Sequence, residues 1–140
     1  KMRLDIQKTE QGYTIINDCY NANYDSMKSA IEYLKNIEGK RKIAVLGDML
    51  ELGEYSKELH EKVGLEVAKN KIDILITVGK EAENIARVAK NNGIKHVYTF
   101  DNNKDATEKL KKIIAVDDVA LIKASNSMNF KEIVESLLKH

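Results

Sequence analysis

The stretch YTIINDCYNANYDSMKSAIEYLKNI, residues 13–37, contains a short apolar run, a polar loop and a longer segment with helical periodicity. The apolar run, residues 13–16, has the β-branched content of a buried strand. Apolar side chains then recur at three- and four-residue spacing, at Met27, Ile31, Leu34 and Ile37. This order predicts a strand that leads through a polar loop into a helix. In open α/β sheets, loops in this position bind ligands, because side chains and helix N-termini converge there.

The same order recurs along the rest of the chain. Further apolar runs predict strands at residues 43–46, 72–78, 96–100 and 119–122. Segments with helical spacing lie around residues 55–67, 85–89, 110–114 and 130–138. Strands joined by crossover helices run parallel, and continuous apolar runs suit strands that are covered on both faces. We therefore predict an α/β fold with a three-layer, Rossmann-like, doubly wound sheet that is mostly parallel.

The first residues predict one exception to the parallel arrangement. Met2, Leu4 and Ile6 alternate with polar residues, and Gln11 and Gly12 offer a turn. A strand followed so closely by another pairs with it antiparallel. We expect this first strand to lie at the edge of the sheet.

Length and composition limit the possible classes of protein. The chain has 140 residues, 43% of them hydrophobic, which suits a single domain over residues 1–140. The 23 basic residues balance the 22 acidic ones, so neither nucleic acid nor an anionic membrane is indicated as a partner. No apolar stretch approaches the roughly 18 residues of a membrane span. One cysteine excludes an internal disulfide, and these features together favour the cytoplasm. The start at Lys1 instead of methionine suggests a fragment of a longer protein.

Polar side chains follow three of the predicted strands. They lie at Asp18, at Gly47 and Asp48, and at residues 123–127. Parallel strands place their carboxyl ends along one edge of the sheet, so these loops should share a rim. The sequence therefore predicts one candidate site.

Two of these loops have alternative explanations. Asp48, Glu51 and Glu54 precede a helix that Ser56 could cap, so the acids either bind a ligand or only complement the helix dipole. Residues 122–130 place Lys123 at a strand end. Ser125, Asn126 and Ser127 then stand at a helix start, as in a nest for a carboxylate or phosphate. The alternative for this segment is an ordinary helix cap with a spare lysine.

Several other chemistries lack the spacing that they need. The chain has no GxxxxGK[ST] phosphate loop, GxGxxG, paired-cysteine zinc motif or GxSxG turn, so no catalytic residue or metal site is predicted. His60, His96 and His140 are scattered and are interpreted as surface or packing residues. Cys19 has no histidine near it in sequence, and a small, partly buried side chain explains it better than a nucleophile.

Three segments, NDCYNANYDSM, GDMLELGEYSKELH and IKASNSMNFKEIV, occur in an order and spacing that resemble the C-terminal domain of the Mur ligases. Among these enzymes the chain is most similar to those that add D-alanyl-D-alanine to UDP-N-acetylmuramoyl-tripeptide. The resemblance spans almost the whole chain, and GDMLELG is its most specific part. Mur ligases have three domains, and the central one carries the phosphate loop that this chain lacks.

The resemblance implies one part of an ATP-dependent peptide ligase of peptidoglycan synthesis, and hence of cell-wall biogenesis, cell shape and cell division. In the family, the C-terminal domain closes over the central domain as a lid and presents the incoming amino acid or dipeptide to an acyl phosphate, away from water. ATP and Mg²⁺ are held mainly by the central domain, so the isolated chain is expected to be inactive. The expected partners are ATP, the UDP-linked tripeptide, D-alanyl-D-alanine and the central domain of the same chain, within a monomeric enzyme.

The resemblance also implies roles for individual residues. Arg3 matches the family arginine that approaches the ATP phosphates. The residues that match the loop around the ribose and base are Asp18, Tyr20, Asn21 and Asn23. Asp48 and Glu51 lie where an acid could pair with the dipeptide ammonium group. The residues at the expected position of the dipeptide carboxylate are Lys123, Ser125, Asn126 and Ser127.

Three positions depart from the family pattern. Tyr24 stands where the family usually has proline, and a small effect is expected from this loss. Ala124 and Asn126 replace the glycine and arginine of a KGSR pattern, and asparagine cannot supply the charge of arginine. Either Lys123 supplies that charge or the acceptor differs. A different class of function also stays open, that of a non-catalytic α/β module that binds a nucleotide or small metabolite.

Overall fold

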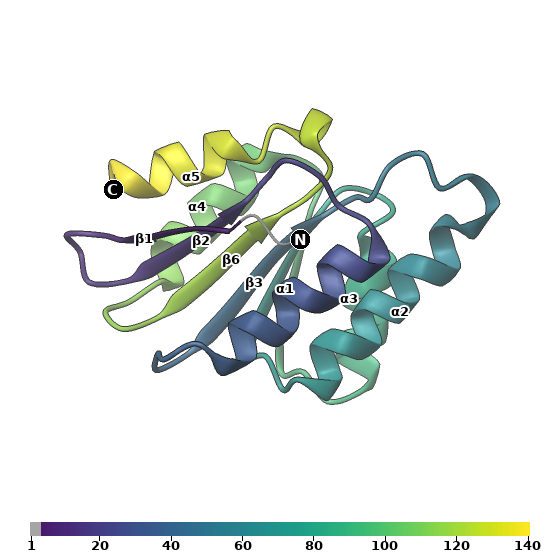
Figure 1. Ribbon diagram of the computed structural model, residues 1–140, viewed down its shortest axis with the longest axis horizontal. Coiled ribbons are helices and arrows are strands. Elements are labelled where there is room, and N and C mark those ends of the chain that lie inside the picture. Colours follow the sequence, from purple (N-terminus) through teal and green to yellow (C-terminus); the bar gives the residue numbers. More distant parts are fainter. Residues whose placement is uncertain (1–3) are drawn as a thin grey trace.

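The computed structural model describes residues 4–140, and its sheet has the strand order β1-β2-β6-β3-β4-β5 (Figure 1). The strands are β1 (Asp5–Lys8), β2 (Thr14–Asp18), β3 (Lys42–Gly47), β4 (Ile74–Val78), β5 (His96–Phe100) and β6 (Val119–Lys123). The helices are α1 (Tyr24–Asn36), α2 (Ser56–Lys69), α3 (Glu83–Asn91), α4 (Asn103–Ile113) and α5 (Lys131–Leu138). Two short 3₁₀ helices, η1 (Gly53–Tyr55) and η2 (Asn126–Met128), precede α2 and α5.

The predicted parallel sheet with an antiparallel edge strand is confirmed. β1 pairs antiparallel with β2, with Ile6 opposite Ile16, whereas every other pair of neighbouring strands is parallel. β6 is the last strand in sequence, but it lies between β2 and β3 and pairs with both. The predicted first strand extends over Met2, which lies outside the described residues.

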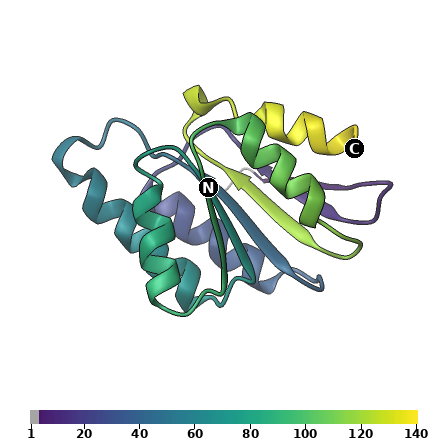
Figure 2. The same cartoon turned by 180° about the vertical axis from the view of Figure 1, so that it is seen from behind.

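The helices cover both faces of the sheet and give the predicted three layers (Figures 1 and 2). One hydrophobic core lies under α1, α2 and α3, where Met27, Val67 and Ile85 are buried. The other lies under α4 and α5, where Leu110 and Ile133 are buried. Among the helices of residues 4–140, none is long and apolar enough to cross a membrane.

Helix starts differ from the periodic patterns because side-chain caps extend the helices. α1 begins at Tyr24, ahead of the first apolar residue of its stripe, since Asn23 caps it. α4 begins at Asn103, well before residue 110, because the Asn102 side chain accepts the Asp105 N–H. α5 begins only at Lys131, so the predicted helix start at residues 125–127 is instead the 3₁₀ turn η2. Short polar caps carry no periodic signal, which explains why the apolar pattern placed the starts of α1 and α4 too late.

The end of β3 requires glycine. A Cβ atom built on Gly47 would lie 2.6 Å from Cζ of Phe130 and 2.7 Å from Cβ of Ala124. The absence of a side chain therefore lets the segment after β6 approach β3 closely. This contact brings two of the three polar loops together.

Candidate functional site

The candidate site is a rim formed by the loops that follow β2, β3 and β6. α1 and α2, which follow β2 and β3, pack on one face of the sheet, whereas α5, which follows β6, packs on the other. The two neighbours of β6, namely β2 and β3, therefore continue into helices on one face of the sheet, whereas β6 itself continues into a helix on the other face. Crevices for ligands form at such switch points in open α/β sheets. The prediction that the three loops share one rim is confirmed by the contacts between them.

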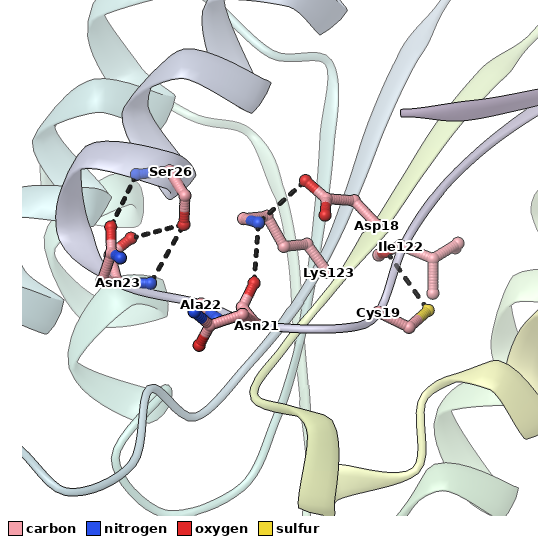
Figure 3. A network of polar contacts seen from close by, with 8 residues as sticks. All are labelled: Asp18, Cys19, Asn21, Ala22, Asn23, Ser26, Ile122 and Lys123. Atoms are coloured by element: carbon pink, nitrogen blue, oxygen red, sulfur yellow. Dashed lines mark hydrogen bonds and ion pairs between the residues drawn. The ribbon is translucent and has the colours of Figure 1, made fainter. Parts of the chain in front are cut away.

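An ion pair between Lys123 and Asp18 joins the first and third loops (Figure 3). The Lys123 Nζ atom lies 2.8 Å from Oδ2 of Asp18 and donates to the carbonyl oxygen of Asn21 at 2.9 Å. The two side chains are 2% and 11% exposed, respectively. The Asn21 side chain in turn accepts the Ala22 N–H at 2.9 Å. Lys123, predicted to meet a carboxylate of the substrate, thus already binds a carboxylate of its own chain.

Asn23 caps helix α1 (Figure 3). Its Oδ1 atom accepts the Ser26 N–H at 2.8 Å, and the Ser26 hydroxyl accepts the Asn23 N–H at 3.0 Å. This reciprocal capping box fixes where the loop turns into the helix. The proline expected at position 24 is therefore not needed to start the helix at Tyr24. The geometry gives Asn23 a structural task, and its contact with a nucleotide stays a prediction.

Cys19 is buried beside this network (Figure 3). Its Sγ atom lies 3.6 Å from the carbonyl oxygen of Ile122. Burial, and to a smaller extent the charge of Asp18, raise the pKa of the thiol to about 12. A thiol that stays protonated at neutral pH is a poor nucleophile. The interpretation of Cys19 as a packing residue agrees with this environment.

The loop after β3 is tied to the loop after β6 by two hydrogen bonds. Ser125 donates its N–H to the Asp48 carbonyl oxygen at 3.1 Å, and its hydroxyl accepts the Leu50 N–H at 2.9 Å. Ser125 is buried, so these bonds are shielded from water. Ser125 therefore holds two loops together.

The Asp48 carboxylate is aimed at the turn between β4 and α3. Its Oδ1 atom accepts the Ala82 N–H at 2.7 Å. Burial raises the pKa of this carboxyl above its ordinary value, and the hydrogen bond from Ala82 acts in the opposite direction. Gly79 has a φ of 108°, and a Cβ atom there would lie 2.5 Å from the Asp48 carboxylate. Only glycine at position 79 therefore leaves room for the Asp48 carboxylate beside this turn.

Ser56 does not cap α2 as the sequence suggested. Tyr55 occupies the N-cap position and makes no side-chain capping bond. The Ser56 hydroxyl instead donates to Oε1 of Glu81 at 2.5 Å. The prediction was wrong because the 3₁₀ turn η1 runs directly into α2, so Ser56 is already the first residue of the helix.

Six of the predicted site residues are exposed at the rim, namely Tyr20, Asn21, Asn23, Glu51, Asn126 and Ser127. Tyr20 is 66% exposed although it is large and aromatic. Glu51 has a left-handed backbone with a φ of 63°. Arg3, the remaining predicted residue, lies outside the described residues. Side chains that are exposed at a switch point are available for a ligand or a second domain.

A cavity of about 110 Å³ opens on the side of the rim that faces α5. It is lined by Asn17, Cys19, Tyr20, Asn126, Asn129, Phe130 and Lys131. The Oδ1 atom of Asn17 is buried and has no hydrogen-bond partner in the described part of the chain. Asn17, Asn129 and Lys131 were missed by the sequence reasoning, which looked only at residues directly after strands. The basic residue close after Asn126 was the signal that could have drawn attention to Lys131.

The described residues do not provide a metal site. Within residues 4–140, no three His, Cys, Asp or Glu side chains are grouped so that they could hold a metal ion. We therefore derive no step that involves Mg²⁺.

The chain matches a known family model and known proteins. Residues 2–126 match the model described as "Mur ligase, glutamate ligase domain". The UDP-N-acetylmuramoyl-tripeptide--D-alanyl-D-alanine ligase of Bacillus subtilis (strain 168) is 40% identical over 144 residues, which cover 99% of this chain and 31% of that enzyme. The enzyme of the same name from Escherichia coli (strain K12) is 35% identical and covers 88% of this chain and 26% of its own length. The chain thus spans about a third of the length of such relatives.

Solved structures agree with this similarity. The MurF ligase from Thermotoga maritima in complex with ADP has a TM-score of 0.80 and 30% identity, over 96% of this chain and 30% of that one. MurF from Acinetobacter baumannii has a TM-score of 0.83 and 26% identity, over 99% of this chain and 30% of that one. The strand order, the shared rim and these matches lead to one conclusion. The protein belongs to the Mur ligase family, as a C-terminal domain similar to those of the ligases that add D-alanyl-D-alanine.

Proposed function

We propose that this chain is the acceptor-binding lid of an ATP-dependent ligase that joins D-alanyl-D-alanine to UDP-N-acetylmuramoyl-tripeptide in peptidoglycan synthesis. One observation carries the proposal. The three segments on which the resemblance rests converge on one rim, through the bonds of Lys123 with Asp18 and of Ser125 with Asp48 and Leu50. The names of the relatives supply the reaction, and their greater length supports a longer parent chain.

In the proposed enzyme the rim faces the central domain of the same chain. ATP and Mg²⁺ are held mainly by that domain, and closure of the lid shields the reacting groups from water. The solved relative in complex with ADP supports the use of a nucleotide. The isolated chain is therefore inactive in this proposal, and the complete enzyme works as a monomer in the cytoplasm.

The rim residues divide into two groups in this proposal. Asp18, Asn21, Asn23, Asp48, Lys123 and Ser125 bind other parts of the chain and set the shape of the loops. Tyr20, an exposed aromatic residue, contacts the nucleotide in this proposal, and the same role is proposed for Arg3, which lies outside the described residues. Glu51 offers a negative charge to the dipeptide ammonium group.

The dipeptide carboxylate needs a cation that the loop after β6 does not provide. Lys123 is committed to Asp18, and Asn126 has no charge. Lys131 lines the same cavity as Asn126 and Asn129. We assign the carboxylate to this cavity, with Asn126 and Asn129 as hydrogen-bonding partners and Lys131 as the positive charge.

The proposal is tested with the intact parent protein by measuring phosphate release with ATP, magnesium and UDP-N-acetylmuramoyl-tripeptide. D-alanyl-D-alanine is added to one of two matched samples. Phosphate release that depends on the dipeptide supports the ligase. A parent protein that binds ATP but shows no such dependence contradicts the proposal and favours a non-catalytic module that binds a nucleotide or small metabolite.

A further inference from the structure

His60 is fully buried on α2, and both of its ring nitrogens are engaged. Nε2 accepts the Met49 N–H at 2.9 Å, and Nδ1 lies 2.7 Å from the carbonyl oxygen of Ser56. A backbone amide can only donate, so Nε2 carries no proton. Nδ1 then carries it and donates to the Ser56 carbonyl. The ring is therefore neutral and held in one tautomer.

Met49 is the middle residue of three that attach the loop after β3 to different parts of the protein. Asp48 accepts from Ala82 in the turn before α3, and Leu50 donates to Ser125 after β6. Met49 itself is 1% exposed, so its amide has little access to water as an alternative partner. His60 is thus the attachment of this loop to α2.

The residues that follow Leu50 in this loop include two with a left-handed backbone conformation. Glu51 and Gly53 have φ values of 63° and 56°, and a left-handed conformation is unfavourable for glutamate. Such a conformation persists only where the flanking residues are fixed. The hydrogen bonds of Met49 and Leu50 lie directly before Glu51 and supply that restraint.

A histidine in a core often serves packing alone. An apolar side chain of similar volume would fill the same space, but it would leave the Met49 N–H and the Ser56 carbonyl without a side-chain partner. The two interpretations differ in one respect. Packing depends on volume, whereas anchoring depends on an acceptor at the position of Nε2.

We propose that His60 is a positioning residue for the acceptor dipeptide, because it fixes Met49 and thereby the orientation of Glu51 on the rim. It acts through the loop and does not itself touch the substrate. The inference rests on the proposed function for its effect on turnover. The anchoring of the loop is independent of that function.

Two substitutions in the full-length parent enzyme separate anchoring from packing. His60→Gln places an amide oxygen near the position of Nε2, where it accepts the Met49 N–H. His60→Asn reaches only the position of Nδ1, so it keeps the bond to Ser56 and loses the bond to Met49. His96, which is exposed on β5, provides the control substitution His96→Asn.

We expect His60→Asn to raise the KM for D-alanyl-D-alanine about tenfold, as for the loss of one buried hydrogen bond. The KM for ATP should change less than about twofold, because the loop after β2 keeps its own bonds. His60→Gln and His96→Asn should retain the parent KM for the dipeptide within about threefold. Equal effects of the Asn and Gln substitutions at position 60 would overturn the proposal.

Amide hydrogen exchange of the peptide that covers residues 48–53 gives a second measurement on the same full-length variants. His60→Asn should speed exchange there about tenfold, and His60→Gln should not. A parent enzyme without dipeptide-dependent turnover contradicts the proposed function, while the exchange result still decides whether His60 anchors the loop. Faster exchange with an unchanged KM overturns the positioning role. If His60→Asn does not fold, the test rests on His60→Gln. In that variant, a KM for D-alanyl-D-alanine more than about threefold above the parent value, or faster amide exchange in residues 48–53, overturns the inference.

Discussion

Replacement of Lys123 by methionine tests the ion pair that joins β2 to β6. Methionine has nearly the length of lysine without its charge, so Lys123→Met leaves the volume of the core almost unchanged. The substitution removes the donor to Asp18 Oδ2, at 2.8 Å, and to the carbonyl oxygen of Asn21, at 2.9 Å. The Asp18 carboxylate then stays buried without a positive partner.

Removal of one partner from a buried ion pair costs about 3–5 kcal/mol of unfolding free energy. The Asp18 side chain keeps 11% of its exposure, which gives water some access to the carboxylate, so we expect about 3 kcal/mol, at the lower end of that range. For a chain of 140 residues this corresponds to a Tm lower by about 10 °C.

Urea unfolding of the wild-type chain, of Asp18→Asn, of Lys123→Met and of the double variant measures the pair directly. The double variant should be more stable than Lys123→Met alone, because it no longer buries an unpaired charge. A loss below about 0.5 kcal/mol for Lys123→Met would refute the reasoning, since a lysine free for substrate could be replaced at that small cost.

In the intact parent enzyme, Lys131→Ala should raise the KM for D-alanyl-D-alanine about tenfold, because Lys131 lines the proposed acceptor cavity. The control Lys139→Ala, at the exposed C-terminal end of α5, should not change this KM. If the two variants have the same KM, Lys131 does not belong to the acceptor site. Gly47→Ala should destabilise the chain by about 2 kcal/mol in urea unfolding, because the new Cβ atom would lie 2.6 Å from Phe130. Unchanged stability would show that the segment after β6 can move to make room for it. The pKa of Cys19, about 12 instead of the ordinary 9.0, reduces its thiolate fraction at pH 8 about a thousandfold. We expect iodoacetamide to label it only after unfolding. Because the unfolded thiol loses its proton first, the contribution of Cys19 to stability should fall as the pH rises from about 9 to about 12 in urea titrations; no change over this range would contradict the raised pKa.

Much of the fold could be predicted because its signals are local. Alternation of apolar runs with helical spacing identified each strand and α-helix of the described residues but not the two 3₁₀ helices, and the turn at Gly12 identified the antiparallel edge. Helix starts were less certain, because Asn23 and Asn102 act through single hydrogen bonds that leave no periodic pattern. The shared rim followed from the parallel direction of the strands.

The sequence by itself determined the order of strands and α-helices along the chain, the class of sheet and the edge at which polar loops gather. The tertiary structure alone decided which polar residues bind each other there. Asp18 and Lys123 are 105 positions apart, and they meet because β6 pairs beside β2. The burial of His60 against Met49 likewise depends on how α2 packs on the loop after β3. Periodicity reports which face of an element is apolar, but partners between buried polar groups are set by the order of the strands and by the exclusion of water, which no local pattern contains.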